Sequence, residues 1–177
     1  MGLFAKDYKC PKCGKTSRIF KWAEAKCPYC TVLVVPNYDI IGPTGDLTAT
    51  QLGLLEAARA YPGAHIGESE VHPLLMAMAA RHAKYQADRR QMGHQLFSER
   101  VAELQKSMGH LAFSEIAAVS WREQVNASKR ELGDEMMKCW RNSAPHWSVA
   151  SKKHKYVGGD MALGTDDGWY SCMLVAD

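Results

Sequence analysis

Apolar side chains recur at every third or fourth position through most of the chain after its first quarter, and this spacing predicts amphipathic helices. The first helix is expected to begin at Asp46 or Thr48 and to end at Pro62, because proline stops a helix. Two further helices are expected over about 71–91 and about 97–107. The first part of this region is therefore predicted to be helical.

The second of these helices has a buried side that its sequence reveals. Four residues recur there at helical spacing, namely Leu75, Met78, His82 and Tyr85. Because His82 shares this side with apolar residues, we interpret it as a ring packed in the core and not as a ligand.

The second half of this region has a different pattern. Residues 113–121 form a short apolar run that Glu115 interrupts, so this carboxylate is expected at a sheet edge or facing a polar cavity. A further helix is expected over 123–143, with a weak point at Gly133. Two alternating segments on either side of 164–168 predict an antiparallel hairpin. Helices followed by strands indicate an α+β fold.

The N-terminal segment carries two cysteine pairs, each with two residues between its members. Thirteen residues separate the pairs, and Gly14 allows the positive φ that a tight knuckle needs. Four thiolates in this arrangement suit one structural zinc ion, because a closed site leaves no coordination position for catalysis. Residues 16–23 and 31–35 resemble short strands, so the segment is predicted to be a zinc ribbon. The predicted zinc ligands are Cys10, Cys13, Cys27 and Cys30.

The predicted ribbon is basic, whereas the rest of the chain is not. Residues 1–36 carry seven lysine and arginine residues against two acids, and the remainder carries 15 basic and 17 acidic residues. These lysines could meet the phosphates of a nucleic acid. They are spread along the segment, however, so a solvated face or a docking surface for another protein is the favoured interpretation. Iron in a rubredoxin-like site is the alternative metal, and the short interval between the pairs disfavours it.

Length and composition indicate one globular domain with a small attachment. The chain has 177 residues, of which 46% are hydrophobic and 23% are charged. Prolines and glycines then divide it into a zinc ribbon at 1–36, a linker at 37–46 and a body at 47–177. No apolar run is long enough for a membrane span, and the first residues do not resemble a secretory signal. We therefore expect synthesis in the reducing cytoplasm, with Cys139 and Cys172 as reduced, half-buried side chains.

Three motifs of the body follow one another along the chain. The first is a helix rich in leucine, alanine and histidine that ends in a small residue and a histidine, LLMAMAARHAKYQADRRQMGH. The second is SEIAA, and the third is WRNSAPH. In this order the motifs resemble those of the CAP superfamily of cysteine-rich secretory, antigen 5 and pathogenesis-related proteins, in particular its short bacterial members. That family has a similar helix, then Gly-Glu-Asn-Ile-Ala and then Trp-x-x-Ser-Pro-Gly-His. The resemblance covers about 47–176 and implies a CAP-like α-β-α sandwich with a central cleft.

In this family, histidines and acids of these motifs face one another in the cleft and can hold a divalent ion. Carried over by motif, the resemblance implies that His94, Glu115 and His146 meet in this protein. Two neutral imidazoles and one carboxylate, completed by water, are a sensible partial site for zinc or a similar ion. The same three side chains could instead form a hydrogen-bonded polar cluster without a metal.

The sequence departs from the family pattern at several positions. Ser114 and Ile116 replace the glycine and the asparagine around the acid, and Ala144–Pro145 replaces the Pro-Gly before the second histidine. A second acid that animal members have in the cleft cannot be located from the spacing, although Asp134 and Glu135 are candidates. The cleft motif is therefore only partly matched.

Two classes of function follow from the candidate cleft. A metal-dependent hydrolase of peptides or cell-envelope material would use His94, Glu115 and His146 to activate water. No separate nucleophile with a paired base is evident, and members of the family mostly resemble binding modules for sterols, lipids or protein partners. We therefore predict a non-catalytic binding or structural module with protein partners in an assembly. A nucleic-acid-associated zinc ribbon is the alternative from a third class.

The expected site of synthesis needs to be reconciled with the family resemblance. CAP domains are usually exported, whereas this chain is expected to be made in the cytoplasm without a signal peptide. Release by cell lysis, as a component of a bacteriophage virion, reconciles these two expectations. In such a particle the zinc ribbon would dock and the CAP-like body would be displayed.

Overall fold

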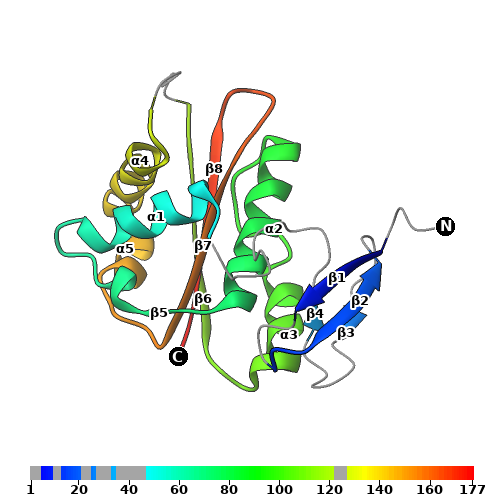
Figure 1. The fold of residues 1–177 in the computed structure, drawn as a ribbon. Helices are drawn as coiled ribbons and strands as arrows, with labels where there is room; N and C mark the ends of the chain where they lie inside the picture. The colour runs from blue at the N-terminus through cyan, green and yellow to red at the C-terminus, as the bar shows by residue number, and fades with distance from the viewer. Residues whose placement is uncertain (1–4, 10–12, 21–24, 27–32, 35–46, 122–126) are drawn as a thin grey trace.

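The computed structural model of the chain describes residues 5–9, 13–20, 25–26, 33–34, 47–121 and 127–177. Most of the described residues belong to the predicted body, whose helices surround a central sheet (Figure 1). The elements of this body, in chain order, are α1 (Ala49–Ala60), the short 3-10 helix η1 (Ile66–Glu68), β5 (Glu70–Val71), α2 (Pro73–Arg89), α3 (Phe97–Met108), β6 (Phe113–Ser120), α4 (Lys129–Arg141), α5 (Ala144–Ala150), β7 (Tyr156–Leu163) and β8 (Trp169–Ala176).

The central sheet has four strands in the order β5-β7-β8-β6. Strands β7 and β8 pair antiparallel, which confirms the predicted hairpin, and β8 also pairs antiparallel with β6. Strand β5 is short and pairs parallel with β7, so the sheet is mixed. Helices combined with a mixed sheet confirm the predicted α+β class.

Helices cover both faces of this sheet (Figure 1). Two adjacent glycines of β7 identify the two faces, because successive residues of a strand point in opposite directions. A side chain at Gly158 would collide with Leu75 and Met76 of α2, whereas one at Gly159 would meet Leu54 of α1 at 3.1 Å. Helices α1, α4 and α5 lie on one face and α2 and α3 lie on the other, which gives an α-β-α sandwich.

Each face of the sheet has its own apolar core. On the α1 side, Trp140 of α4 and Met173 of β8 are fully buried. On the α2 side, Leu75 and Leu174 are fully buried, and Leu104 anchors α3. Complete burial of such a side chain stabilises the fold by about 1.5–3 kcal/mol. The two cores therefore hold the helices on opposite sides of the sheet.

The beginning of α1 agrees with its sequence. The Thr48 side chain accepts a hydrogen bond from the backbone of Gln51, and the Gln51 side chain accepts one from the backbone of Thr48. This reciprocal capping box satisfies two backbone donors at the end of the helix. On α2, Met78 and His82 are buried as predicted, with 4% and 2% of their surfaces exposed.

Helix α4 is continuous through Gly133, so the predicted weak point does not interrupt it. A Cβ atom at this position would lie 2.7 Å from the carbonyl oxygen of Gly53 and 2.8 Å from Cβ of Ala57. The glycine is therefore explained by the close approach of α4 to α1. The helix also begins later than 123, because Ser128 is its N-cap.

The described part of the N-terminal unit contains four short strands, namely β1 (Ala5–Lys9), β2 (Thr16–Phe20), β3 (Ala25–Lys26) and β4 (Leu33–Val34). They form two antiparallel pairs, β1 with β2 and β3 with β4. Gly14 has a φ of 69°, which confirms the positive φ expected after the first cysteine pair. Cys10, Cys27 and Cys30 lie outside the described residues, so the zinc ribbon and its metal stay a prediction.

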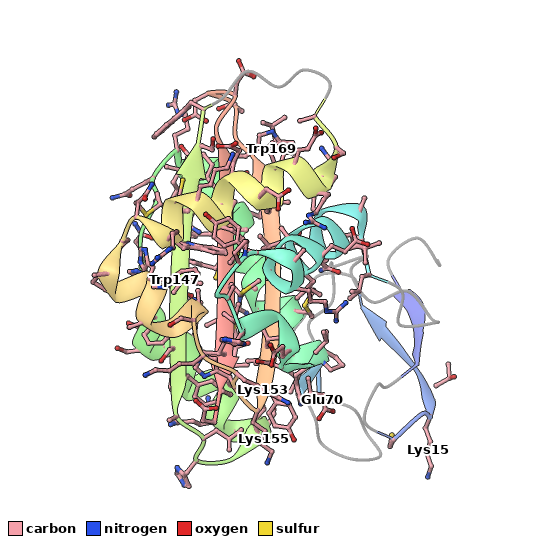
Figure 2. The ribbon with its side chains drawn as sticks, turned by 90° about the vertical axis from the view of Figure 1, so that its left-hand side faces the viewer. Lys15, Glu70, Trp147, Lys153, Lys155 and Trp169 are labelled. Carbon is pink, nitrogen blue, oxygen red and sulfur yellow. The ribbon has the colours of Figure 1, made fainter. Side chains whose placement is uncertain are left out.

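The two ends of the central sheet differ in the side chains that they carry. Figure 2 shows Trp169 near one end and Lys153, Lys155 and Glu70 near the other. Lys129 lies over the Trp169 ring, 4.0 Å from its centre.

None of the helices in the described part of the chain combines the length and the apolar composition that a membrane span requires.

Candidate functional site

The structure brings together the three side chains that the family resemblance implies. His94 lies in the loop between α2 and α3, Glu115 lies on β6, and His146 lies on α5. Nδ1 of His94 is 3.0 Å from Oε1 of Glu115, and Nε2 of His94 is 3.5 Å from Nε2 of His146. We name these three residues, together with His82, Arg100 and Cys172, the histidine cluster.

Glu115 forms the buried centre of the histidine cluster, with only 1% of its side chain exposed. Arg100 donates to both of its carboxylate oxygens, and the Cys172 thiol donates to Oε2 at 3.3 Å. Burial alone would raise the pKa of Glu115, but the hydrogen bonds from Arg100 and His94 outweigh burial and lower the pKa to about 2. The carboxylate is therefore charged and occupied by donors.

The charge of Glu115 determines which ring nitrogen of His94 donates to it. A carboxylate only accepts hydrogen bonds, so Nδ1 of His94 must carry the proton and donate it. In neutral His94, the lone pair then lies on Nε2, which faces His146. This is the arrangement in which a buried carboxylate orients an imidazole for a cation.

Arg100 is a residue of the cluster that sequence analysis missed. It projects from α3 with 7% of its side chain exposed and also donates from Nη2 to the carbonyl oxygen of Gln95, at 3.0 Å. A signal for it exists in the sequence, because Arg100 precedes the buried Leu104 by four residues and so shares its helix face. Only the fold reveals that this buried arginine faces Glu115.

His82 was interpreted as a packed ring, and its burial confirms that interpretation. The ring stacks on Tyr85 with centres 5.9 Å apart. Its Nε2 donates to the carbonyl oxygen of Gly93 at 2.8 Å and lies 3.6 Å from Oε1 of Glu115. Burial lowers the pKa of His82, which favours the neutral ring. His82 therefore both fills the core and supports the loop that carries His94.

That loop has an unusual backbone. Arg90 and Leu96 have φ values of 52° and 55°, and Gly93 has a φ of 154°. A left-handed conformation costs a residue with a side chain about 1–2 kcal/mol. Met92 and Leu96 are also 44% and 55% exposed, on either side of His94 in the chain. The contacts of His82 and Arg100 with the loop offset this cost.

His146 reaches the cluster from the short helix α5. Ala144 and Pro145 begin α5, and Pro145 suits a first turn because a helix needs no donor there. Burial and the nearby His94 lower the pKa of His146, so its neutral form is favoured.

The two candidates for a second acid lie on α4, where Asp134 binds Arg130 and Glu135 binds Lys138.

The geometry allows a specific test of whether the cluster fits a cation. Two nitrogens bound tetrahedrally to one zinc ion lie about 3.3 Å apart, close to the 3.5 Å between the Nε2 atoms of His94 and His146. Within the described residues, no group of three or more His, Cys, Asp or Glu side chains is placed to hold a metal ion. The fit is therefore to an ion with two imidazole ligands, with Glu115 behind His94 and not as a third ligand.

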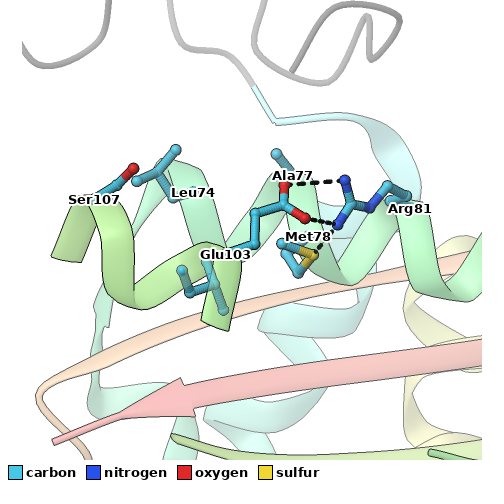
Figure 3. A pocket seen from close by; sticks show the side chains of 7 residues that line it. Leu74, Ala77, Met78, Arg81, Glu103 and Ser107 are labelled. Atoms are coloured by element: carbon cyan, nitrogen blue, oxygen red, sulfur yellow. Dashed lines mark hydrogen bonds and ion pairs between the residues drawn. The ribbon is translucent and has the colours of Figure 1, made fainter. Parts of the chain in front are cut away.

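A small pocket on the outer side of α2 and α3 is a second feature of the described surface (Figure 3). Its volume of about 10 Å³ has room for about one water molecule. Arg81 crosses it to donate to both oxygens of Glu103, at 3.1 and 2.5 Å. The pocket is too small for a ligand. Its polar lining includes the ion pair of Arg81 and Glu103, which joins α2 to α3. Its lining residues are Leu74, Ala77, Met78, Arg81, Glu103, Leu104 and Ser107.

Comparisons with known proteins do not assign the chain to a family. No family model matches the chain. No curated protein matches it either. Among solved structures, it is similar to an outer surface protein from Borrelia burgdorferi, with a TM-score of 0.49 and 18% sequence identity over 70% of this chain and 86% of that one. The identity and the TM-score are too low for any conclusion about function.

Proposed function

We propose that the body is a non-catalytic binding module of the CAP type, in which His94 and His146 bind a divalent cation of the zinc class. The observation that carries this proposal is the pair of imidazoles whose Nε2 atoms lie 3.5 Å apart. Imidazole nitrogen is a preferred ligand of zinc and of similar metals. When bound, such an ion supplies a Lewis-acid centre with open positions for water or for a donor atom of a partner.

The surroundings of Glu115 argue against the hydrolase alternative. A general base needs an accessible oxygen and a pKa near the working pH. Glu115 is 1% exposed and binds Arg100 through both oxygens, with a pKa of about 2. Its role in the proposal is therefore to hold His94 in the tautomer whose Nε2 lone pair is available.

The N-terminal unit has a separate role in this proposal. We infer that Cys10, Cys13, Cys27 and Cys30 hold one structural zinc ion and that the ribbon docks the chain on a protein partner. The short strands β1 to β4 and the positive φ of Gly14 support a ribbon. The location in a bacteriophage virion stays a prediction, which mass spectrometry of purified particles tests. Salt-dependent DNA binding by the full chain would favour the nucleic-acid alternative instead.

Metal analysis of purified protein tests the proposed cation site. The wild type, dialysed against zinc, is expected to retain two zinc ions per chain, one in the ribbon and one in the cluster. His94→Ala and His146→Ala are each expected to retain one, whereas Cys13→Ser is expected to lose the other. Equal zinc content in the wild type and in both histidine variants would contradict the proposal.

A further inference from the structure

We propose that Arg100 is a positioning residue for His94, and this inference rests on the proposed function. Arg100 acts on His94 from two directions. Its guanidinium donates to both oxygens of Glu115, and Glu115 in turn accepts a hydrogen bond from Nδ1 of His94. The guanidinium also donates to the carbonyl oxygen of Gln95, which follows His94 in the chain. The Arg100 side chain thus holds both the backbone next to His94 and the Glu115 carboxylate to which the His94 ring donates.

The contact with Glu115 sets the direction of the His94 ring. The His94 side chain is 45% exposed, so packing alone does not fix its orientation. Its hydrogen bond to Glu115 does so only if the carboxylate itself is held in place. Two donors of one planar guanidinium hold both carboxylate oxygens in one plane, which a single positive charge on a flexible chain cannot do.

The contact with Gln95 sets the position of the His94 backbone. The loop from Arg90 to Leu96 passes through two left-handed conformations that are unfavourable for residues with side chains. Directly before His94, His82 on α2 donates to the carbonyl oxygen of Gly93. Near the end of the loop, Arg100 on α3 donates to that of Gln95. His94 lies between these two contacts, so the loss of either one is expected to loosen its backbone.

A cation site depends on such support beyond its direct ligands. The replacement of a group that orients a metal ligand typically weakens metal binding by about 10- to 100-fold. Because His94 and His146 would be the only described protein ligands, a small rotation of one ring removes half of the protein's donors. Arg100 contacts Glu115 and Gln95, so it would act on the cation site through these two residues.

The test uses the full chain with zinc in the ribbon and follows the binding of a second zinc ion. Arg100→Met removes all donors, and Arg100→Lys keeps one positive charge without the planar fork, so it is the variant more certain to fold. Arg81→Met is the matched control, because Arg81 also binds both oxygens of a glutamate, on the outer side of the same helix pair. Both Arg100 variants are expected to bind the second zinc at least about 10-fold more weakly, and Arg81→Met within about 2-fold of wild type.

A second measurement separates positioning from general stability. The ¹⁵N NMR spectrum of the His94 ring, recorded without the second zinc, is expected to show one tautomer with the proton on Nδ1 in the wild type and in Arg81→Met. In Arg100→Lys it is expected to show a mixture. Wild-type affinity together with a wild-type ring spectrum in Arg100→Lys would overturn the inference. If His94→Ala binds the second zinc normally, the proposed function fails, and the ring spectra still decide the role of Arg100.

Discussion

Two arginine–glutamate pairs join α3 to its neighbours, and they lie in very different surroundings. In the pair of Arg81 and Glu103, the side chains are 26% and 19% exposed, whereas in the pair of Arg100 and Glu115 they are 7% and 1% exposed. Water can solvate the first pair if one partner is lost. The second pair is buried, so each charge depends on the other to offset the loss of hydration. An arginine–glutamate ion pair therefore has two roles in this fold. Arg81 and Glu103 join α2 to α3, whereas Arg100 and Glu115 support the candidate binding site.

Of the changes that test this comparison, the loss of Arg100 is expected to have the largest effect on the unfolding free energy. Arg100→Met leaves the Glu115 carboxylate buried without its main donors, and removal of one partner of a buried pair costs about 3–5 kcal/mol of unfolding free energy. Urea denaturation followed by circular dichroism measures this loss. A loss no larger than that of Arg81→Met would break the distinction between the two pairs.

The second-largest effect is the dependence of the unfolding free energy on pH, which comes from Glu115. Folding lowers the pKa of Glu115 from its ordinary value of 4.5 to about 2. The resulting contribution of about 3 kcal/mol to the unfolding free energy is present above about pH 5 and is lost as the pH falls towards 2. Glu115→Gln removes this titration. Between pH 6 and pH 2.5, the variant is expected to lose about 2–3 kcal/mol less stability than the wild type in urea titrations. Parallel pH profiles of the two proteins would contradict the lowered pKa.

A smaller effect is expected from the histidine behind the loop. His82→Phe keeps a ring against Tyr85 but removes the donor to the carbonyl oxygen of Gly93. An unsatisfied buried acceptor costs about 1–3 kcal/mol. Hydrogen exchange is also expected to become faster in the loop from Arg90 to Leu96. Unchanged exchange there would show that His82 fills the core without supporting the loop.

The smallest effect on stability is expected for the exposed pair. Arg81→Met is predicted to change the unfolding free energy by about 1 kcal/mol or less, because both side chains are partly solvated. Part of that change is expected to disappear in about 1 M salt, since salt screens exposed charges. A loss above about 3 kcal/mol would mean that the two pairs do not differ as their exposure suggests.

Much of the body could be predicted from local patterns. Apolar periodicity located α1, α2 and α3, and alternation around 164–168 located the hairpin. These patterns are informative because each element must bury one face. The order of three short motifs also brought His94, Glu115 and His146 into one hypothesis, and the structure places their side chains side by side.

The partners of those residues could not be predicted, because they depend on how α2, α3 and β6 pack. Arg100 shares a helix face with Leu104, but nothing local shows that Glu115 lies opposite. The sequence also suggested Glu115 as a ligand or base, whereas its environment makes it the acceptor that orients His94. Gly133 likewise suggested a weak helix, because local propensity carries no information about the close approach of α1.

The most direct test of this account is a crystal structure of the full chain soaked with zinc, with anomalous scattering recorded at the zinc edge. The account predicts a peak about 2.0–2.1 Å from Nε2 of both His94 and His146, with Nδ1 of His94 still bonded to Glu115 and Arg100 still holding both carboxylate oxygens. A zinc ion bound directly by Glu115, or no zinc between the two imidazoles, would contradict it.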